Sequence, residues 1–509
     1  MSSTASSAAN SAVASAASSA ANNAANSAAR VSVIIPAWNL WDMTAACLRS
    51  LAEHTHGENI EVVVVDNGST DATATELDPL GKALFGSDFR PVRLPENQGF
   101  AKGCNAGAAA SDGELLFFLN NDTTMTPNWL PPLRQALEQP RVGAVGPLLL
   151  YPNGTVQHCG IYFTPFMAVG HLYEGFPGGH AAPRKKRPLQ AITGAALLLR
   201  KSVFMDCGGF YEEYRNGFED MDLCCALRAR GHKLAVEGGS VIVHHTSQTP
   251  GRFDHNTFNG ALLMRRHGSS LKPDLHTLVA LDGYELVMGP DLDVWPVLPD
   301  AQEERRNKAF DALSASEDVC RLMLEQEPLW RGGWHRLMDM LEAGGNAHEA
   351  LQCGVRCAMF FGDAVSRQRL LALTARVEGA DSASSLSAVM KTDAFGAQAG
   401  ALTGQSAEES AEEFAGQSAD EFAGQSAGES GGHTAGQTAV RPAGNSVAQA
   451  ADTPVAQAAD TPAAQTARPG GMADLAKIKV QQARRAAYAR GDGILAEIFN
   501  QWLMRYGRP

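Results

Sequence analysis

The sequence predicts an α/β fold organised around a parallel sheet, and three observations support this prediction. Residues 31–39 (VSVIIPAWN) are a short apolar run, rich in β-branched residues, that stops at a proline. Such a run is typical of a strand buried on both faces. A second apolar run at 60–65 follows a stretch with helical spacing at 44–54, which is the order of a βαβ unit. Four predicted strands end in polar residues or proline, at the sheet edge where open α/β folds bind ligands.

Further elements follow in order along the chain. Strands are predicted at 91–94, 114–119 and 143–150, and residues 97–107 form a glycine-rich turn that opens a helix of small residues. A buried strand and a helix follow from Thr193, a strong helical pattern runs from Phe218 to Arg230, and residues 233–243 supply one or two more strands.

The chain divides into five parts. These are a leader at 1–29, an α/β domain at 30–275, a helical region at 300–379, a low-complexity linker at 380–470 and a C-terminal helical segment at 471–509. Leader and linker bury too little apolar surface to offset chain entropy, so both are expected to be disordered. The C-terminal segment has the pattern of an amphipathic hairpin, which at the end of a linker is more often a docking element for a protein partner.

Within the helical region, one pattern resembles a known repeat. Trp334, Leu337, Leu341, Gly345 and Ala350 fall at offsets similar to those of a single tetratricopeptide-type hairpin. Because a solenoid needs about three repeats for stability, a small helical cap explains the pattern equally well.

Composition and charge exclude several classes of function. A formal net charge of −13 argues against binding to nucleic acid, whose phosphates attract basic surfaces. The nine cysteines are scattered without a CxxC pair, which favours reduced thiols in a cytoplasmic protein over a zinc or disulfide framework. No segment offers about 18 consecutive apolar residues, so no membrane span is expected, while peripheral attachment at the inner face of a membrane stays open.

The motif Asn120-Asn121-Asp122 follows a predicted strand and is the first candidate site. A carboxylate fixed there can hold Mg²⁺ or Mn²⁺ between its own oxygen and those of a diphosphate, because these metals prefer hard oxygen ligands. The structural alternative is that Asp122 caps a helix beginning near Pro127 or closes an Asx-turn.

Two further strand ends carry groups suited to a nucleotide. Asp66 and Asn67 can accept hydrogen bonds from a nucleobase edge or a ribose, although the run DNGSTD also fits a plain turn into a helix. The turn at 97–107 is glycine-rich like phosphate loops but matches neither GxGxxG nor a Walker sequence. Its small residues fit helix packing equally well.

Three carboxylates, those of Glu219, Asp220 and Asp222, stand at the start of a predicted helix. The helix N-terminus is a sufficient explanation for one or two of them. A base that deprotonates a sugar hydroxyl also needs a carboxylate near the reacting carbon, and Asp220 is suitably placed. His244 and His245 end the last predicted strand and offer a neutral imidazole to a metal, although a surface histidine is the commoner case.

The basic run at 184–187 (RKKR) allows two interpretations. A solvated loop is the simpler one, and the alternative is a mobile loop that helps to neutralise a diphosphate or an acidic acceptor.

Taken together, these residues resemble the family 2 nucleotide-sugar glycosyltransferases, and within them the rhamnosyltransferase-like branch. The matching elements, in order, are VSVIIPAWN, VVVVDNGSTD, NQGFAKGCNAG, FLNNDTTMTPNWL, TGAALLLRKSVFMDCGGF, GFEDMDLCCALRARGH and VIVHHTSQT. They span residues 31 to about 250, and seven motifs in the right order are specific although each alone is weak. The resemblance implies the inverting GT-A fold with a mixed sheet.

The resemblance also implies roles for the candidate residues. The nucleotide-binding set is Pro36, Asn39, Asp66, Asn67, Asn97, Gly99, Asn105 and Asn121. Asp122 is similar to the metal-binding member of the DXD motif, His244 is the further metal ligand with His245 as the other candidate, and Asp220 is the catalytic base with Glu219 as the secondary candidate. Asparagine at both earlier positions of the DXD-like motif departs from the family pattern and predicts a weaker hold on the metal.

The expected function is transfer of a sugar from a UDP-, dTDP- or GDP-linked donor to a glycan, lipid-linked or protein acceptor, assisted by Mg²⁺ or Mn²⁺. The alternative is an inactive transferase-like scaffold that binds protein partners through its helical region and tail. The presence of both Asp122 and Asp220 favours the enzyme. A nucleotidyltransferase is disfavoured because the basic loop for pyrophosphorolysis is not apparent.

Overall fold

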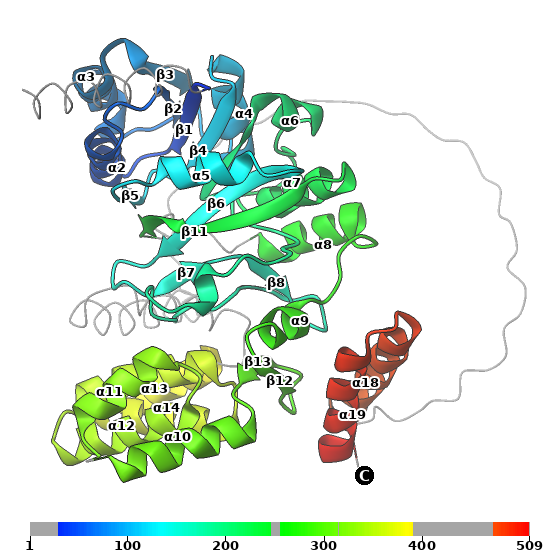
Figure 1. Cartoon of the computed structure of the whole chain (residues 1–509). Coiled ribbons are helices and arrows are strands. Elements are labelled where there is room, and N and C mark those ends of the chain that lie inside the picture. Colours follow the sequence, from blue (N-terminus) through cyan, green and yellow to red (C-terminus); the bar gives the residue numbers. More distant parts are fainter. Residues whose placement is uncertain (1–28, 246–254, 314, 390–471, 508–509) are drawn as a thin grey trace, which may run out of the picture.

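The structure is a computed structural model that describes residues 29–245, 255–313, 315–389 and 472–507 (Figure 1). The strands are β1 (Val31–Ala37), β2 (Ile60–Asn67), β3 (Phe89–Leu94), β4 (Leu115–Leu119), β5 (Thr123–Met125), β6 (Val142–Leu150), β7 (Val156–His158), β8 (Ile161–Phe163), β9 (Val169–His171), β10 (Ala196–Arg200), β11 (Lys233–His244), β12 (Glu285–Met288) and β13 (Val294–Val297). The helices of the α/β domain are α2 (Trp41–His54), α3 (Thr73–Phe85), α4 (Phe100–Ala110), α5 (Leu130–Leu137), α6 (Lys201–Asp206), α7 (Glu219–Ala229), α8 (Asn256–His267) and α9 (Leu275–Ala280).

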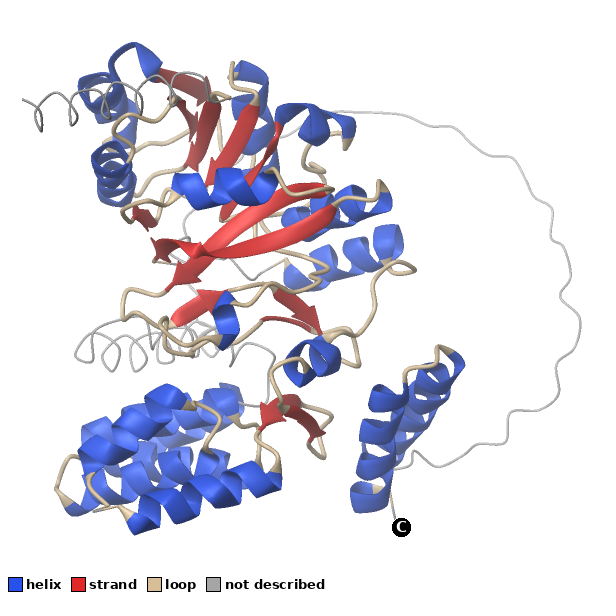
Figure 2. Ribbon diagram, in the orientation of Figure 1, coloured by secondary structure: helices blue, strands red, loops and turns tan. Residues whose placement is uncertain are grey.

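One mixed sheet forms the centre of the α/β domain, with the strand order β3-β2-β1-β4-β10-β6-β11-β5 and with β7 paired to β6. The first four strands of this order are mutually parallel, β10 is antiparallel to both of its neighbours, and β11 runs parallel to β6. Figure 2 shows this sheet as a twisted layer between helices. The predicted α/β fold is confirmed.

Strand β1 is buried along its whole length, as its apolar sequence predicts. Val33 and Ile35 face one side of the sheet and belong to the core formed with α2, α3 and α5. Ile34 faces the opposite side and belongs to the core formed with α4, α6 and α7. Because side chains alternate along a strand, one apolar run supplies both cores.

Two elements of the α/β domain differ from the sequence expectation. Strand β5 directly follows Asp122, so this aspartate leads into a strand and does not cap a helix; α5 begins only at Leu130. The segment between α9 and the helical region, for which no strand was expected, contains the hairpin of β12 and β13.

The helical region comprises α10 (Asp300–Ala312), α11 (Glu317–Gln326), α12 (Arg331–Ala343), α13 (Ala347–Phe360), α14 (Ala364–Val377) and α15 (Ala380–Val389). It therefore extends ten residues into the stretch expected to be a linker. Helices α12 and α13 form the predicted hairpin, in which Trp334, Leu341 and Ala350 are buried. The expected disorder of the leader and of the rest of the linker concerns residues that lie outside the described ones.

The predicted C-terminal helices are present as α18 (Met472–Ala489) and α19 (Gly493–Tyr506), and the chain turns between them at Gly491, where φ is +72°. This hairpin docks on the α/β domain: the indole Nε1 of Trp502 donates to the carbonyl of Gly289 at 2.7 Å, and Asp492 lies 3.0 Å from Nε2 of His276. Among the described helices, none has the length and apolar character needed to cross a bilayer.

Candidate active site

Antiparallel pairing of β5 with β11 brings the first two candidate side chains together. His244 is in register with Thr123, and Asp122 immediately precedes Thr123. Both side chains are almost completely buried, and Nε2 of His244 lies 3.1 Å from Oδ1 of Asp122. Residues far apart in the sequence therefore meet because a three-residue strand closes the edge of the sheet.

The hydrogen bonds of His244 determine which of its ring nitrogens carries the proton. Nδ1 lies 2.8 Å from Oε1 of Gln157, and an amide oxygen can only accept, so Nδ1 is the donor. In the neutral ring, Nε2 then carries a lone pair, which accepts from Nδ2 of Asn120 at 3.2 Å. The same lone pair faces the carboxylate of Asp122.

This arrangement fits a divalent cation. Oδ1 of Asp122 and Oδ1 of Asn120 are buried and accept no hydrogen bond from any described residue. Two electron-pair donors, Oδ1 of Asp122 and Nε2 of His244, thus face each other across 3.1 Å, and a proton or a cation between them would be stabilised by both. The second nitrogen of His244 is held by Gln157, as is usual for histidines that bind metals.

The described residues supply two ligands of this kind and no group of three or more His, Cys, Asp or Glu side chains suited to a metal. Mg²⁺ commonly takes only one or two carboxylates from the protein and completes its shell with substrate phosphates and water. A pair of protein ligands is therefore compatible with a metal that also binds a diphosphate.

The carboxyl group of Asp122 is ionised at neutral pH. Burial alone raises the pKa of this carboxyl group, but the electrostatic attraction of His244 outweighs the burial, so the pKa lies below its usual value.

Asp220 lies at the first turn of α7, half-buried, and its carboxylate accepts two backbone hydrogen bonds. Oδ2 accepts from the N–H of Gly194 at 2.9 Å, and Oδ1 accepts from the N–H of Met221 at 2.8 Å. Phe218, the residue before α7, has a φ of +74°, a left-handed conformation that is strained for a phenylalanine. Such strain is kept where the surrounding structure fixes a side chain in place.

The segment of residues 193–195 connects the two parts of the site. Gly194 holds Asp220 through its N–H, and the carbonyl of Ala195 accepts from the N–H of Asn120 at 2.8 Å. The N–H of Thr193 donates to Nε2 of His158 at 3.3 Å. Three consecutive residues of main chain therefore set the spacing between Asp220, the motif at 120–122 and a buried histidine.

The other two carboxylates of α7 have structural partners. Oε2 of Glu219, which is buried, accepts from the N–H of Gly217 at 2.7 Å. Asp222 is buried in a network in which Tyr214, Arg266 and His267 surround it. This leaves Asp220 as the most exposed of the three carboxylates.

Asp66 and Asn67 lie at the end of β2, where both side chains are buried. Asp66 accepts from the N–H of Ser69 at 2.9 Å and forms an ion pair with Arg93. The amide of Asn67 donates to Oδ1 of Asn97 and to the carbonyl of Gly99, both at 3.1 Å. The four predicted nucleotide-binding residues from these two segments are thus brought together at one edge of the sheet.

Asn39 and Pro36 complete this edge from β1. Asn39, in a left-handed conformation with φ of +54°, accepts from the N–H of Thr70 at 2.8 Å and so holds the turn that follows β2. Pro36 lies beside α4, where a Cβ on Gly103 would stand 3.4 Å from its ring. A Cβ on Gly107 would be 2.4 Å from Ile34, so the small residues of α4 are required for packing against β1.

The remaining candidates lie in the same domain but make other contacts. Asn105 donates to the carbonyl of Phe210 and to Glu212, both at 2.9 Å, and so anchors the segment before α7. Asn121 donates to Oγ1 of Thr44 on α2 at 2.9 Å. The ring of His245 faces Thr124 at 3.1 Å, so of the two adjacent histidines it is His244 that reaches Asp122.

Residues of β7 belong to the site although the sequence did not single them out. Gln157 orients His244, and His158, which is 1% exposed, links Thr193 to His171, whose Nδ1 lies 2.7 Å from Nδ1 of His158. Burial and the neighbouring histidines hold the pKa of His158 well below its usual range, so this ring is neutral. The motif TGA at 193–195 offered a signal, since a glycine between a loop and a buried strand indicates close approach of the backbone.

The basic run at 184–187 is exposed at Arg184, Lys185 and Lys186, as expected for a solvated loop, but it is anchored to the domain through Arg187. The side chain of Arg187 is 2% exposed and forms an ion pair with Asp282, which also accepts from Nζ of Lys185 at 2.7 Å. Arg184 donates to the carbonyls of Gly178 and Gly238. Lys186 lies 3.5 Å from Glu237, so all four cations have a partner in the domain.

Glu174, in the segment that pairs with β7, gives a prediction for stability against pH. Burial raises the pKa of Glu174 to about 7, although the hydroxyl of Tyr151 donates to its carboxylate at 2.5 Å. Because the folded pKa lies above that of the unfolded chain, the stabilisation is complete below pH 4.5 and is lost as the pH rises through about 7. We expect Glu174→Gln to raise the free energy of unfolding at pH 8 by roughly 1–3 kcal/mol and to change it little at pH 4.5.

Urea unfolding of Glu174→Gln at the two pH values, with the exposed-site variant Glu114→Gln as control, measures this effect. An equal gain at both pH values would show that burial of the charge is not its source.

Comparison with known proteins identifies the domain. Residues 32–208 match the family model described as Glycosyl transferase family 2. The chain is 33% identical over 226 residues to the O-antigen biosynthesis protein RfbC of Myxococcus xanthus, an alignment that covers 43% of this chain and 17% of that protein. It is 26% identical over 216 residues to the N-acetylglucosaminyl-diphospho-decaprenol L-rhamnosyltransferase of Mycobacterium tuberculosis, with coverage of 38% and 69%.

Among solved structures, the chain is similar to that of GalNAc-T7 with UDP, GalNAc and Mn²⁺, with a TM-score of 0.37, 19% identity and coverage of 42% of this chain and 43% of that one. The present chain spans a quarter or less of the length of the first curated relatives that it matches. The mixed sheet followed by helices is the GT-A arrangement that the sequence motifs imply. The chain thus contains a glycosyl transferase family 2 domain.

Proposed function

We propose that this protein is an inverting glycosyltransferase that moves a sugar from a nucleotide-diphosphate donor to a hydroxyl group of a glycan, lipid-linked or protein acceptor. The family match of residues 32–208 supports the reaction class. The observation that carries the assignment of residues is the segment 193–195, whose main chain holds Asp220 on one side and the strand end at Asn120 on the other. A base and a diphosphate-binding pair are thereby held at neighbouring points of one sheet edge.

In the proposed reaction, Asp220 accepts the proton of the acceptor hydroxyl while that oxygen attacks the anomeric carbon. The new carbon–oxygen bond forms as the bond from the anomeric carbon to the diphosphate oxygen breaks, and the diphosphate leaves with the electron pair. Two backbone N–H groups keep the carboxylate of Asp220 in one orientation, which favours proton transfer to a defined oxygen. Attack from the side opposite the leaving group inverts the anomeric configuration.

Asp122 and Nε2 of His244 are the groups that would hold Mg²⁺ or Mn²⁺. The bound cation would neutralise the charge that develops on the diphosphate as it leaves. Gln157 and Asn120 keep the ring of His244 in the tautomer that offers its lone pair. Asparagine at positions 120 and 121 leaves Asp122 as the single carboxylate of the motif.

The proposed nucleotide site lies at the ends of β1 and β2. Asp66, Asn67 and Pro36 would contact the nucleoside, and Asn97 and Gly99, which accept hydrogen bonds from the Asn67 amide, would line the site beside Asn67. Asp66 also neutralises Arg93, so the nucleoside would share this carboxylate with an existing ion pair.

The finer assignment is a transferase of the rhamnosyltransferase-like branch that acts in polysaccharide assembly, in the cytoplasm or at the inner face of the membrane. The names of the two relatives, an O-antigen biosynthesis protein and an L-rhamnosyltransferase, support it. The donor is UDP-, dTDP- or GDP-linked, and the C-terminal hairpin is the proposed contact for a protein partner.

A screen of nucleotide-sugars by thermal unfolding tests the proposal. We expect at least one UDP-, dTDP- or GDP-sugar to raise the melting temperature when MnCl₂ is present, since a ligand at 100 times its Kd adds about 2.7 kcal/mol of stability. The same donor should then be hydrolysed or transferred in a metal-dependent assay. Asp122→Ala serves as the control, because it should lose the metal-dependent part of the shift. If no sugar nucleotide of the three classes shifts the melting temperature or reacts, the proposal is wrong.

A further inference from the structure

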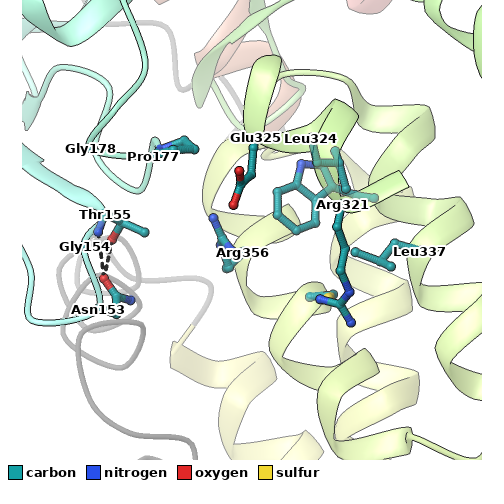
Figure 3. Close-up of a pocket in the computed structure, with 12 residues that line it drawn as sticks. Asn153, Gly154, Thr155, Pro177, Gly178, Arg321, Leu324, Glu325, Leu337 and Arg356 are labelled. Atoms are coloured by element: carbon teal, nitrogen blue, oxygen red, sulfur yellow. Dashed lines mark hydrogen bonds between the residues drawn. The ribbon is translucent and has the colours of Figure 1, made fainter. Parts of the chain in front are cut away.

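A cavity of about 280 Å³ lies between the α/β domain and the helical region, away from the candidate active site. Residues 153–155 and 177–178 form one wall, and Arg321, Glu325, Trp334 and Arg356 come from α11, α12 and α13 on the other (Figure 3). The cavity lies at the small end of the range for ligand pockets, so it fits a ligand smaller than a typical drug molecule.

Arg356 is the unusual residue of this cavity. Its guanidinium lies 5.0 Å from the centre of the Trp334 ring, and no described residue forms a hydrogen bond or an ion pair with it. The neighbouring Arg321, by contrast, is bonded to Glu317 and Glu349. The ring beneath Arg356 is fixed, because Nε1 of Trp334 donates to the carbonyl of Pro328 at 2.8 Å.

A guanidinium in this position calls for an anion. Arg356 is half-buried, and burial lowers its pKa while the charge of Glu325 partly opposes this shift. A guanidinium that is partly removed from water is stabilised by a partner of opposite charge. Its planar fork of N–H donors matches the oxygens of a carboxylate or a phosphate. Stacking on Trp334 leaves the edge of the guanidinium, where those donors lie, free to meet a ligand.

The opposite wall is preformed by the α/β domain. Oδ1 of Asn153 accepts from both the N–H and the hydroxyl of Thr155, at 3.0 and 2.8 Å, and the N–H of Gly178 donates to the carbonyl of Gly154 at 3.0 Å (Figure 3). These bonds fix the loop without using the side-chain amide nitrogen of Asn153. Both walls are thus ordered by contacts within their own parts of the chain.

Glu325 is the internal alternative as a partner for Arg356. It is the single carboxylate among the described residues that line the cavity, and its side chain is exposed. Glu325 lies beyond ion-pair distance of Arg356, although its negative charge still favours the charged form of that guanidinium. Replacing Glu325 by glutamine separates the two explanations. If Arg356 binds an external anion, the substitution removes a repulsive charge and tightens anion binding. If Glu325 is itself the partner of Arg356, the substitution removes that partner and lowers stability.

We propose that this cavity binds a small ligand carrying an oxyanion, either a phosphate or a carboxylate, with Arg356 as its anchor. The ligand joins the α/β domain to the helical region, since each contributes one wall. The site does not depend on the sugar-transfer reaction proposed above.

Thermal unfolding and calorimetric titration of the whole chain test this site. The probes are potassium phosphate and glucuronate, which distinguish the two sources of the oxyanion, with glucose and potassium chloride at equal ionic strength as controls. We expect at least one anion, but neither control, to raise the melting temperature. Arg356→Met, which keeps an apolar stem over Trp334, should weaken binding about tenfold or more, and Arg356→Lys should weaken it less.

Glu325→Gln should bind the same anion about threefold more tightly, because a like charge is removed. The proposal is overturned if neither anion differs from potassium chloride, or if Arg356→Met binds as well as the unmodified protein. It is also overturned if Glu325→Gln lowers the melting temperature as much as Arg356→Met does without improving anion binding, since Glu325 would then be the partner of Arg356.

Discussion

Replacing Asp220 by Asn is expected to lower kcat by about 10²–10⁴-fold, the usual contribution of general base catalysis. The substituted amide keeps the bond from the N–H of Gly194 through its oxygen and loses the one from the N–H of Met221, so the fold and donor binding should be preserved at a small cost in stability. KM for the donor is therefore expected to change little. Steady-state kinetics with the donor found in the nucleotide screen, together with the melting temperature of the variant, measure both effects.

Glu219→Gln is the matched control for this prediction, because it changes the adjacent carboxylate in the same way. Glu219 is buried against the N–H of Gly217, so its substitution should leave kcat within about tenfold of the unmodified enzyme. If Glu219→Gln loses activity and Asp220→Asn keeps it, the base has been assigned to the wrong carboxylate.

His244→Ala and Asp122→Ala are each expected to reduce kcat by about 10²–10³-fold, because a bound cation supplies several kcal/mol of charge stabilisation to the leaving diphosphate. The Mn²⁺ concentration needed for half-maximal activity should rise in both variants. Metal titration at saturating donor measures it, and addition of EDTA should abolish the activity of the unmodified enzyme.

His245→Ala is the control for the histidine. Its ring faces Thr124 and not Asp122, so its loss should leave the metal requirement unchanged. Equal metal requirements in His244→Ala and His245→Ala would contradict a direct role for His244.

Much of the α/β domain could be predicted from residue patterns because its strands are continuous apolar runs. The run at 31–37 is buried on both faces, and no other element accommodates such a sequence easily. The direction of each strand in the sheet could not be predicted from local sequence. Strands β10 and β5 are antiparallel to their neighbours, and the direction of a strand leaves no mark in its own sequence.

The candidate site was predictable only where a side chain stands next to a recognisable motif. Asp122, His244 and Asp220 belong to such motifs, and the structure places the first two within 3.1 Å of each other. Gln157 and His158 lie on a strand of three residues, which is too short for a periodic signal. The role of segment 193–195 depends on main-chain N–H and C=O groups that every sequence possesses, so Gly194 is its one sequence signal and indicates close approach of the backbone without naming the partner.

The docking of α19 on the α/β domain also has a consequence for synthesis of the chain. Trp502 donates to the carbonyl of Gly289, and more than two hundred residues must be added after Gly289 before Trp502 exists. At the usual 5–20 residues per second, this takes roughly 10–40 s. The sheet of the nascent α/β domain can therefore form well before α19 is synthesised. During this interval the surface around α9 and β12 is exposed to solvent, and His276 lacks its partner Asp492.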